Sequence, residues 1–276
     1  MRVVLLAVAL LCSAAARADL RPEWEFGLGA SALTLPDYRG SDESRGYLLP
    51  FPYLIYRGER LRVDRQGVRG IFFESDRVEF NLSLNATPPV DSADNRAREG
   101  MPSLDPTIEI GPRLDLTVAR DRAREWSFEL RLPLRAAIAT DFSHTKHVGW
   151  VAYPHLHFFT RPELGGVKWN LGVQAGPLFA TDDYHEYFYG VEEAFARPDR
   201  PAFTAAGGYS GALALVSLTR RFPRFWVGGF ARYDTLKGAA FEASPLIRRN
   251  YSVMAGFAIA WVFLESGRMV VVDVDE

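Results

Sequence analysis

Two consecutive segments between Asp105 and Thr140 alternate apolar and polar residues with a period of two, and only a short turn separates them. Successive side chains of a β-strand point to opposite faces, so each segment would have one apolar and one charged face. Strands of soluble proteins are usually about 5–6 residues long, whereas a tilted strand that crosses a bilayer needs about 9–11. The pattern predicts an all-β fold, a single transmembrane antiparallel β-barrel in a bacterial outer membrane.

Similar two-faced segments recur along the chain and predict about twelve strands. They lie at 23–35, 47–57, 77–87, 107–118, 126–138, 148–160, 167–179, 204–219, 225–237 and 251–263. Such barrels have an even number of strands, short periplasmic turns and longer outer loops. An even count results when 59–74 is split into a short hairpin at Asp64–Gly67, where Gln66-Gly67 suits a tight turn. Four prolines within these segments predict bulges or local breaks: Pro112, Pro133, Pro154 and Pro177.

The N-terminal residues have the form of a secretory signal peptide. Arg2 gives a positive start, residues 3–12 are apolar, and Ala16-Arg17-Ala18 has the small-x-small pattern of a cleavage site. We expect the segments 1–18, 19–264 and 265–276 to be a cleaved signal peptide, the barrel and a periplasmic tail, the last either disordered or available to a partner. The single cysteine, Cys12, would be removed with the signal peptide, so no disulfide is expected.

Composition is consistent with this prediction and excludes some functions. The net charge of −2 gives no indication of nucleic-acid binding. A hydrophobic content of 48% is expected where lipid-facing and lumen-facing residues alternate, and the 13% of aromatic residues suits the girdles of a barrel. The expected surroundings are outer-membrane lipids and lipopolysaccharide.

The last predicted strand carries apolar residues at every second position and ends in an aromatic residue. This is the form that the barrel-insertion machinery recognises, and an ordinary buried strand is the alternative. The aromatic residues that would make up this membrane-insertion signal are Tyr251, Phe257, Trp261 and Phe263.

Six charged residues on two neighbouring predicted strands share the face opposite to the apolar one: Glu109, Arg113, Asp115, Glu129, Arg131 and Arg135. Their spacing suits cross-strand pairs of opposite charge. One interpretation is a salt-bridged, hydrated filling of the lumen, and the other is a selective pore. We favour the filling, because buried charges must be paired in either case and pairing alone does not make a channel.

The connection 181–203 holds a cluster of aromatic residues: Tyr184, Tyr187, Phe188 and Tyr189. Aromatic side chains on loops are favoured at recognition surfaces. A girdle, or a loop folded over the barrel mouth, would explain the same residues, and the sequence leaves these alternatives open.

Histidines and serines provide the remaining candidates for chemistry. His144 and His147 share a loop, and His155 and His157 share a strand face, but neither pair has a cluster of cysteines or carboxylates at metal-binding spacing. We therefore expect no metal and no cofactor.

A hydrolase would need a serine oriented by a histidine that a third group holds. Only Ser143-His144 and Ser210, within Gly207–Gly211, hint at this, and the glycine pair Gly207-Gly208 more readily indicates a bulge. We expect no enzymatic activity.

Two stretches of sequence resemble the MipA/OmpV family of outer-membrane proteins. The first is Tyr38-Arg39-Gly40-Ser41-Asp42-Glu43 followed by Leu49-Pro50-Phe51-Pro52-Tyr53-Leu54-Ile55-Tyr56-Arg57-Gly58, after which Gly67 fits the family's next hairpin. The second is Tyr184-His185-Glu186-Tyr187-Phe188-Tyr189-Gly190-Val191. The resemblance covers essentially the whole mature chain, and the tail after Phe263 departs from the family's usual aromatic end.

The resemblance implies a membrane barrel without enzymatic activity. The name-giving member is described as a scaffold that brings a lytic murein transglycosylase together with a penicillin-binding murein synthase, and other members as adhesins, immunogenic surface proteins or stress- and antibiotic-linked proteins. The first functional expectation is therefore a scaffold for periplasmic murein-remodelling enzymes, with a lytic murein transglycosylase and a penicillin-binding protein as partners. A small-solute porin and an adhesin-like binder that acts through its outer loops are the alternatives.

Overall fold

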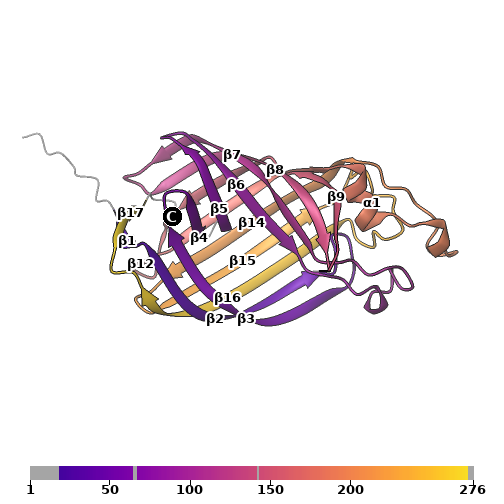
Figure 1. The fold of residues 1–276 in the computed structure, drawn as a ribbon, viewed down its shortest axis with the longest axis horizontal. Coiled ribbons are helices and arrows are strands. Elements are labelled where there is room, and N and C mark those ends of the chain that lie inside the picture. Colours follow the sequence, from indigo (N-terminus) through magenta and orange to yellow (C-terminus); the bar gives the residue numbers. More distant parts are fainter. Residues whose placement is uncertain (1–18, 65–66, 142, 273–276) are drawn as a thin grey trace, which may run out of the picture.

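The computed structural model describes residues 19–64, 67–141 and 143–272, and its main body is an antiparallel β-barrel (Figure 1). The predicted signal peptide, residues 1–18, lies outside the described residues. Figure 1 shows helix α1 (Asp182–Tyr189) at one end of the barrel, and strands β1 (Asp19–Pro22) and β17 (Met269–Val272) at the other. Among the described residues, no helix combines the length and the apolar character needed to cross a membrane.

The wall of the barrel is a ring of antiparallel ladders that closes where the last strand pairs with the first. Its members are β2 (Trp24–Pro36), β3 (Ser44–Arg57), β4 (Leu61–Asp64), β5 (Gly67–Glu74), β6 (Val78–Thr87), β7 (Thr107–Asp121), β8 (Trp126–Thr140), β9 (Thr145–Ala152), β10 (His155–Thr160), β13 (Asn170–Ala180), β14 (Gly208–Arg221), β15 (Phe225–Thr235) and β16 (Tyr251–Glu265). The smaller elements are β11 (Glu163–Leu164), β12 (Val167–Lys168) and the 3-10 turns Ser92–Asp94 and Glu193–Phe195.

Strands β9 and β10 are two parts of one barrel strand. Both pair with β8 on one side and with β13 on the other. The break between them is at Tyr153-Pro154, where the proline has no amide hydrogen for the ladder. With these two parts counted as one, the described residues form a closed barrel of twelve strands, which confirms the predicted fold.

The irregularity predicted at Pro177 also occurs, because the β13–β14 register shifts between Pro177 and Phe179. The prediction is wrong at Pro112 and Pro133: β7 and β8 continue through these prolines, and the β7–β8 register is the same at Ile110–Ala136 as at Arg113–Pro133. A Cβ on the neighbouring Gly111 would lie 2.0 Å from the carbonyl oxygen of Leu134, so only glycine permits the close approach of the two strands there.

The short hairpin that the strand count required is present as β4 and β5. Asp64 pairs with Gly67, whose φ of 105° is in the region that favours glycine. Residues 65–66 lie outside the described residues. These two strands are short, and β4 pairs with β3 only at Tyr56 and Arg57.

One predicted strand, 204–219, begins later than expected, at Gly208. The residues before it bind to α1 instead: the amide of Ala205 donates to Glu186 Oε2 over 2.7 Å, and the amide of Gly207 donates to Asp182. These amides therefore have acceptors outside the sheet, and residues 204–207 belong to the loop.

The two faces of the wall differ as the alternation predicts. Large apolar side chains such as Phe72, Val216 and Ile259 are exposed on the outside, while polar groups fill the inside. On β16 the four aromatic residues of the predicted insertion signal all lie exposed on the outer face: Tyr251, Phe257, Trp261 and Phe263. Their recognition by the insertion machinery stays a prediction.

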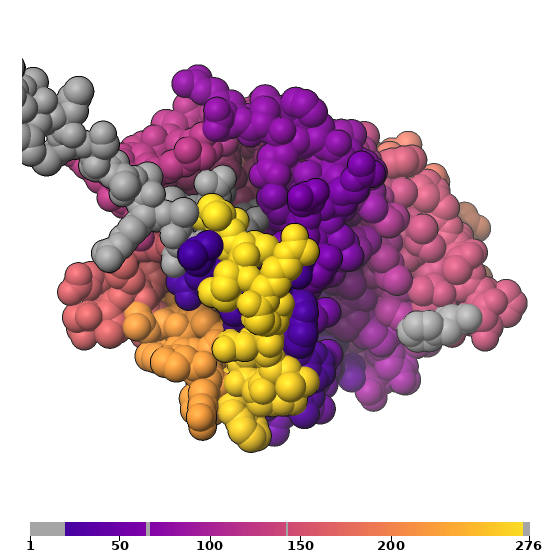
Figure 2. Space-filling view, turned by 60° about the vertical axis from the view of Figure 1, so that its left-hand side comes forward, coloured from indigo at the N-terminus to yellow at the C-terminus, as the bar shows by residue number. Residues whose placement is uncertain are grey.

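The two ends of the described chain form a ribbon that continues the seam of the barrel. Beyond the β16–β2 ladder, the amide of Glu23 donates to the Arg268 carbonyl and the amide of Ser266 donates to the Trp24 carbonyl, both over 2.9 Å. Strands β1 and β17 then pair antiparallel, and Figure 2 shows them together in front of the barrel end. The tail was expected to be either disordered or available to a partner. Its residues 269–272 are ordered and paired with β1, its availability to a partner stays a prediction, and 273–276 lie outside the described residues.

A charged side chain on the outer face of this wall should destabilise the barrel. We expect Val216→Arg, on the exposed outer face of β14, to lower the free energy of unfolding by about 2–4 kcal/mol, because the guanidinium would face hydrocarbon. The matched variant Ser217→Arg, whose side chain lines the lumen, should cost much less. Urea unfolding of vesicle-reconstituted protein, followed by tryptophan fluorescence, measures both. Equal losses would contradict a lipid-facing outer surface.

Candidate functional site

The six charged residues singled out in the sequence come together inside the barrel as three ion pairs. Arg135 Nε lies 3.0 Å from Glu109 Oε2 across the β7–β8 ladder. The other two pairs form along single strands: Arg113 with Asp115 on β7 and Arg131 with Glu129 on β8, each with a nitrogen–oxygen distance of 2.7 Å. The cross-strand spacing thus accounts for one pair only, because guanidinium groups two residues away on the same face reach the other carboxylates.

Neutral and charged neighbours extend this network. Asn81 donates to Asp115 Oδ2 over 3.1 Å, and Asn85 donates to Glu109 Oε2 over 3.2 Å. Arg69 on β5 binds Glu79 Oε1 at 2.8 Å. The charges are paired and mostly buried, which agrees with the favoured interpretation of a salt-bridged filling.

The filling does not occupy the whole lumen. A cavity of about 860 Å³ remains, and both polar and apolar side chains of the inner wall line it. Arg113, Arg131 and Arg135 of the network lie along this cavity, and so do His155 and His157.

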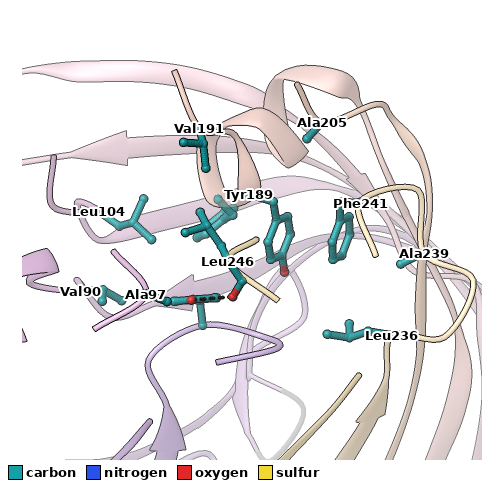
Figure 3. Close-up of a cluster of buried hydrophobic side chains, with 12 residues drawn as sticks. Val90, Ala97, Leu104, Tyr189, Val191, Ala205, Leu236, Ala239, Phe241 and Leu246 are labelled. Atoms are coloured by element: carbon teal, nitrogen blue, oxygen red, sulfur yellow. Dashed lines mark hydrogen bonds between the residues drawn. The ribbon is translucent and has the colours of Figure 1, made fainter. Parts of the chain in front are cut away.

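Packed loops close the end of the barrel at which α1 lies. A buried apolar cluster, here named the plug, joins four connections of the chain (Figure 3). Its buried members are Tyr38, Val90, Ala97, Leu104, Phe188, Tyr189, Val191, Ala205, Leu236, Ala239, Phe241 and Leu246. The rings of Tyr189 and Phe241 stack with centroids 3.7 Å apart and planes 6° apart. Burial on this scale resembles the core of a soluble domain, so the loops form one packed unit.

Hydrogen bonds between loops hold the plug together. Tyr38 Oη donates to the Leu246 carbonyl over 2.8 Å, which is the dashed line in Figure 3. The buried Arg98 donates to the Phe188 carbonyl at 3.1 Å, and Arg200 donates to the Ala97 carbonyl at 3.0 Å. Each of these bonds satisfies a backbone carbonyl of another loop, so the plug's polar groups are paired where water is excluded.

The predicted aromatic cluster on connection 181–203 is part of the plug and its attachment. Phe188 and Tyr189 are buried in the plug, and Tyr184 and Tyr187 pack against it. Tyr184 also contacts the apolar clusters of the inner wall, and its hydroxyl donates to Glu109 Oε1 over 3.3 Å. Of the alternatives left open by the sequence, the structure has the loop folded over the barrel mouth.

A buried histidine fixes α1 to the wall. His185 Nδ1 lies 2.6 Å from the Ala206 carbonyl oxygen, and since that oxygen can only accept, Nδ1 carries the proton. Its Nε2 therefore accepts from the Ser210 hydroxyl over 2.5 Å. Both residues are buried, and burial lowers the pKa of His185 below its ordinary value, with the Arg39 cation adding to the effect.

The serine candidates of the sequence do not form a catalytic arrangement with an accessible nucleophile. Ser143 and His144 are exposed on the β8–β9 loop. Ser210 does have a histidine partner, but the two residues are enclosed at the base of the plug and the third group is a backbone carbonyl. Within the described residues, no group of three or more His, Cys, Asp and Glu side chains is placed to hold a metal ion.

At the opposite end of the barrel, charged residues fix the seam where the ring closes. Glu25 of β2 is buried and binds Arg57 of β3 at 2.8 Å and Arg221 of β14 at 2.5 Å. These contacts lie beside the base of the β1–β17 ribbon, because Arg57 Nη1 also donates to the Pro22 carbonyl over 2.6 Å.

A family model described as "MltA-interacting protein MipA" matches residues 28–263, which is most of the chain and nearly the whole barrel. The chain belongs to the MipA family. The resemblance that the loop motifs indicated is thereby confirmed.

Relatives of this chain are named as outer-membrane proteins. The chain is 25% identical to the outer membrane protein YiaT of Escherichia coli K12 over 268 residues, covering 95% of this chain and 97% of that one. It is 24% identical to Omp26La of Vibrio anguillarum and 23% identical to OmpV of Vibrio cholerae, with 87% of each chain covered. None of these names denotes an enzyme. The chain is an outer-membrane β-barrel of the MipA/OmpV family.

Among solved structures, the chain is similar to the outer membrane protein OprG of Pseudomonas aeruginosa. The identity is 9%, the TM-score is 0.22, and 88% of this chain and 94% of OprG are covered. A similarity at this level carries no weight for the function of this MipA family member.

Sequence reasoning missed three residues that organise the outer mouth: His185, Arg39 and Asp234. Arg39 Nε binds Asp234 Oδ1 at 2.8 Å, and Asp234 also binds Arg232 at 2.7 Å. Arg39 and Asp234 lie far apart in the chain, as do His185 and its partner Ser210, so no local spacing marks these contacts. The position of Arg39 and His185 within the two family motifs was the one available signal.

Removing one partner of the cross-strand pair should destabilise the barrel. We expect Arg135→Met to lower the free energy of unfolding by about 3 kcal/mol, because Glu109 would remain buried without its cation. The double variant Arg135→Met/Glu109→Gln should recover much of this loss. Urea unfolding of the vesicle-reconstituted proteins measures the free energies of unfolding of the native chain and of both variants. A single variant as stable as the native chain would show that the pair does not hold the wall.

The plug should loosen in acid. A histidine whose folded pKa is lowered binds fewer protons folded than unfolded, so the stability it contributes is present above its ordinary pKa of about 6.5 and is lost as the pH falls below it. We expect residues 181–207 to exchange amide hydrogens faster at about pH 5 than at about pH 7.5 after correction for intrinsic rates. His185→Gln should abolish the difference, whereas His144→Gln, at an exposed site, should keep it. Equal protection of the native chain at both pH values would refute the prediction.

Proposed function

We propose that this chain is a non-conducting outer-membrane barrel that acts as a scaffold for periplasmic murein-remodelling enzymes. The observation that carries the proposal is the plug, in which twelve buried residues from four loops close one mouth of the barrel. An open porin needs a continuous aqueous path, and a packed apolar cluster across the mouth blocks it. The barrel then serves as an anchor, and its function lies at the other end.

The end opposite to the plug has the features of a binding surface. Short turns connect the strands there, at 58–60, 75–77, 122–125 and 222–224. In bacterial barrels short turns face the periplasm, so the β1–β17 ribbon would extend into the periplasm as well.

The ribbon itself presents apolar side chains and free strand edges. Leu20 and Val271 are register partners on one face and are 56% and 68% exposed, and Met269 beside them is half exposed. A two-stranded ribbon has unpaired backbone groups along both outer edges, and such edges add a strand from a partner. The family description "MltA-interacting protein" supports a partner of the murein-remodelling class.

The small-solute channel is a second candidate, which the cavity of about 860 Å³ in the lumen favours. It would require the plug to move as a unit. Planar-bilayer recordings separate the two functions: we expect no stable single-channel steps from the native chain, because the mouth is packed. Regular conductance steps at neutral pH would favour the channel.

The scaffold predicts a specific interaction that depends on the ribbon. We expect the detergent-solubilised chain to retain a purified lytic murein transglycosylase of the same bacterium in a pull-down. A variant that ends at Ser266 should lose this partner, since it lacks β17 but keeps the whole of β16. Val271→Lys should weaken binding at least about tenfold, which corresponds to about 1.4 kcal/mol.

The matched control is Leu164→Lys, at another exposed apolar residue of the same end, on the β11–β12 hairpin. It should leave binding unchanged. If the native chain retains neither the transglycosylase nor a purified penicillin-binding protein, the scaffold is ruled out. Equal losses in Val271→Lys and Leu164→Lys would show that the ribbon is not the contact.

A further inference from the structure

The wall of the barrel is not paired along its full height. The ring closes through β4 and β5, but among the described residues the β3–β4 ladder pairs only Tyr56 and Arg57. In this part of the chain, residues 44–55 of β3 form a backbone ladder with β2 and none with β4. On the other side of the hairpin, β5 pairs with β6 only up to Ser83. Figure 1 looks through the space between β3 and β6 onto β14, β15 and β16 of the far wall.

The lumen cavity reaches this gap. Its lining includes inner residues of the wall, and also Leu54 of β3 and Leu84 of β6, both exposed on the outer face. Consecutive residues of both edges, 51–55 of β3 and 83–87 of β6, line this one cavity, so it extends to the two edges of the gap. The gap lies in the half of the barrel nearer the plug, where a membrane barrel faces hydrocarbon.

An open strand edge in hydrocarbon is costly, because its amides and carbonyls have no water to bind. The sequence reduces this cost on β3. Pro50 and Pro52 are two residues apart, so their nitrogens point to the same edge, and a proline is accepted in a sheet where its nitrogen faces away from the ladder. The free edge therefore lacks two donors, and it is suited to contact with apolar chains.

Inside the cavity, below the plug, lies a polar site with an unused donor. The hydroxyl of Tyr153, a residue that is 6% exposed, is buried and has no hydrogen-bond partner among the described residues. The charged residues around it are Arg232, Asp234, Arg135 and Arg39, and the three arginines line the same cavity. Arg39 and Arg232 share one carboxylate, Asp234, so this cluster retains a positive charge.

We propose that the lumen is a binding chamber for a single-chain amphiphile with a carboxylate head, such as a long-chain fatty acid, which enters from the membrane between β3 and β6. The head would accept a hydrogen bond from the Tyr153 hydroxyl and bind the Arg39–Arg232 pair, while the chain would lie along Phe51, Leu54 and Leu84 toward the gap. The cavity of about 860 Å³ lies within the range of about 300–1,000 Å³ typical of small-molecule sites, which favours one chain over a two-chain lipid.

Palmitate binding to the full chain in a maltoside detergent tests the head site. We expect saturable binding, measured by calorimetry and by the fluorescence of the lumen residue Trp226. Hexadecanol and hexadecyltrimethylammonium, which lack an anionic head, should bind at least about tenfold more weakly, or about 1.4 kcal/mol. Hexadecyl phosphate distinguishes a lipid-type phosphate from a carboxylate, and tighter binding of the phosphate would overturn the assignment of the head group.

Tyr153→Phe removes only the unpartnered hydroxyl and breaks no contact within the protein, so folding should be preserved. We expect palmitate to bind about fivefold to tenfold more weakly to this variant, because one hydrogen bond to a charged group is lost. Tyr209→Phe, on β14 outside the cavity lining, is the control and should bind normally. No saturable binding by the folded native chain, or equal affinity of Tyr153→Phe, would overturn the site.

Entry through the gap has its own test. We expect Leu84→Trp to slow the association of palmitate in stopped-flow fluorescence, because the larger ring would narrow the gap. Val216→Trp places the same ring on the outer face of the far wall and should leave the rate unchanged. Equal association rates for the two variants would overturn entry between β3 and β6.

Discussion

Backbone hydrogen bonding in hydrocarbon is the constraint from which this structure follows. A strand in the membrane has no water for its amides and carbonyls, so it needs a neighbour at each edge, and a sheet must close on itself. The chain meets this requirement by pairing β16 with β2, and Glu25 clamps the closure by binding Arg57 and Arg221. Closure then divides each strand into a face toward lipid and a face toward a narrow interior. Charged residues on the inner face have to pair with one another, as Glu109 does with Arg135.

The same constraint makes the unpaired length of β3 informative. A sheet edge in a membrane is stable only if it is covered or if it presents few unsatisfied groups. Pro50 and Pro52 remove two donors from this edge, which stabilises an open edge whatever lies behind it. The cavity behind the edge contains the unpartnered Tyr153 hydroxyl beside Arg39 and Arg232, which share the single carboxylate of Asp234. This buried polar site, which a gap alone would not need, supports the proposed chamber for an amphiphile.

The fold was predictable from the sequence because lipid on one side and the lumen on the other impose an alternation of apolar and polar residues on every strand. This alternation does not depend on the details of tertiary packing. Even Pro154 could be assigned as a local break, since a proline cannot donate to a ladder wherever it lies. The outer mouth could not be predicted in the same way. His185 and Ser210, or Arg39 and Asp234, meet only after the loops fold over the barrel, and no periodicity relates them. For the cluster around Tyr184, the sequence showed that aromatic residues gather but not whether they point outward or inward. That choice is made by burial against the inner wall, which has no local signature.

The two ends of the molecule are stabilised in different ways, and this difference bears on function. The plug is stabilised like a soluble core, by stacked rings such as Tyr189 and Phe241 and by satisfied buried carbonyls. The β1–β17 ribbon is a two-stranded element in which Val272 is buried, whereas Leu20 and Val271 are exposed. Exposed apolar side chains on an element that extends beyond the barrel wall suit a surface that a partner completes, as the proposed scaffold requires. A barrel that passes solutes would instead need a continuous aqueous path through the mouth that the plug closes.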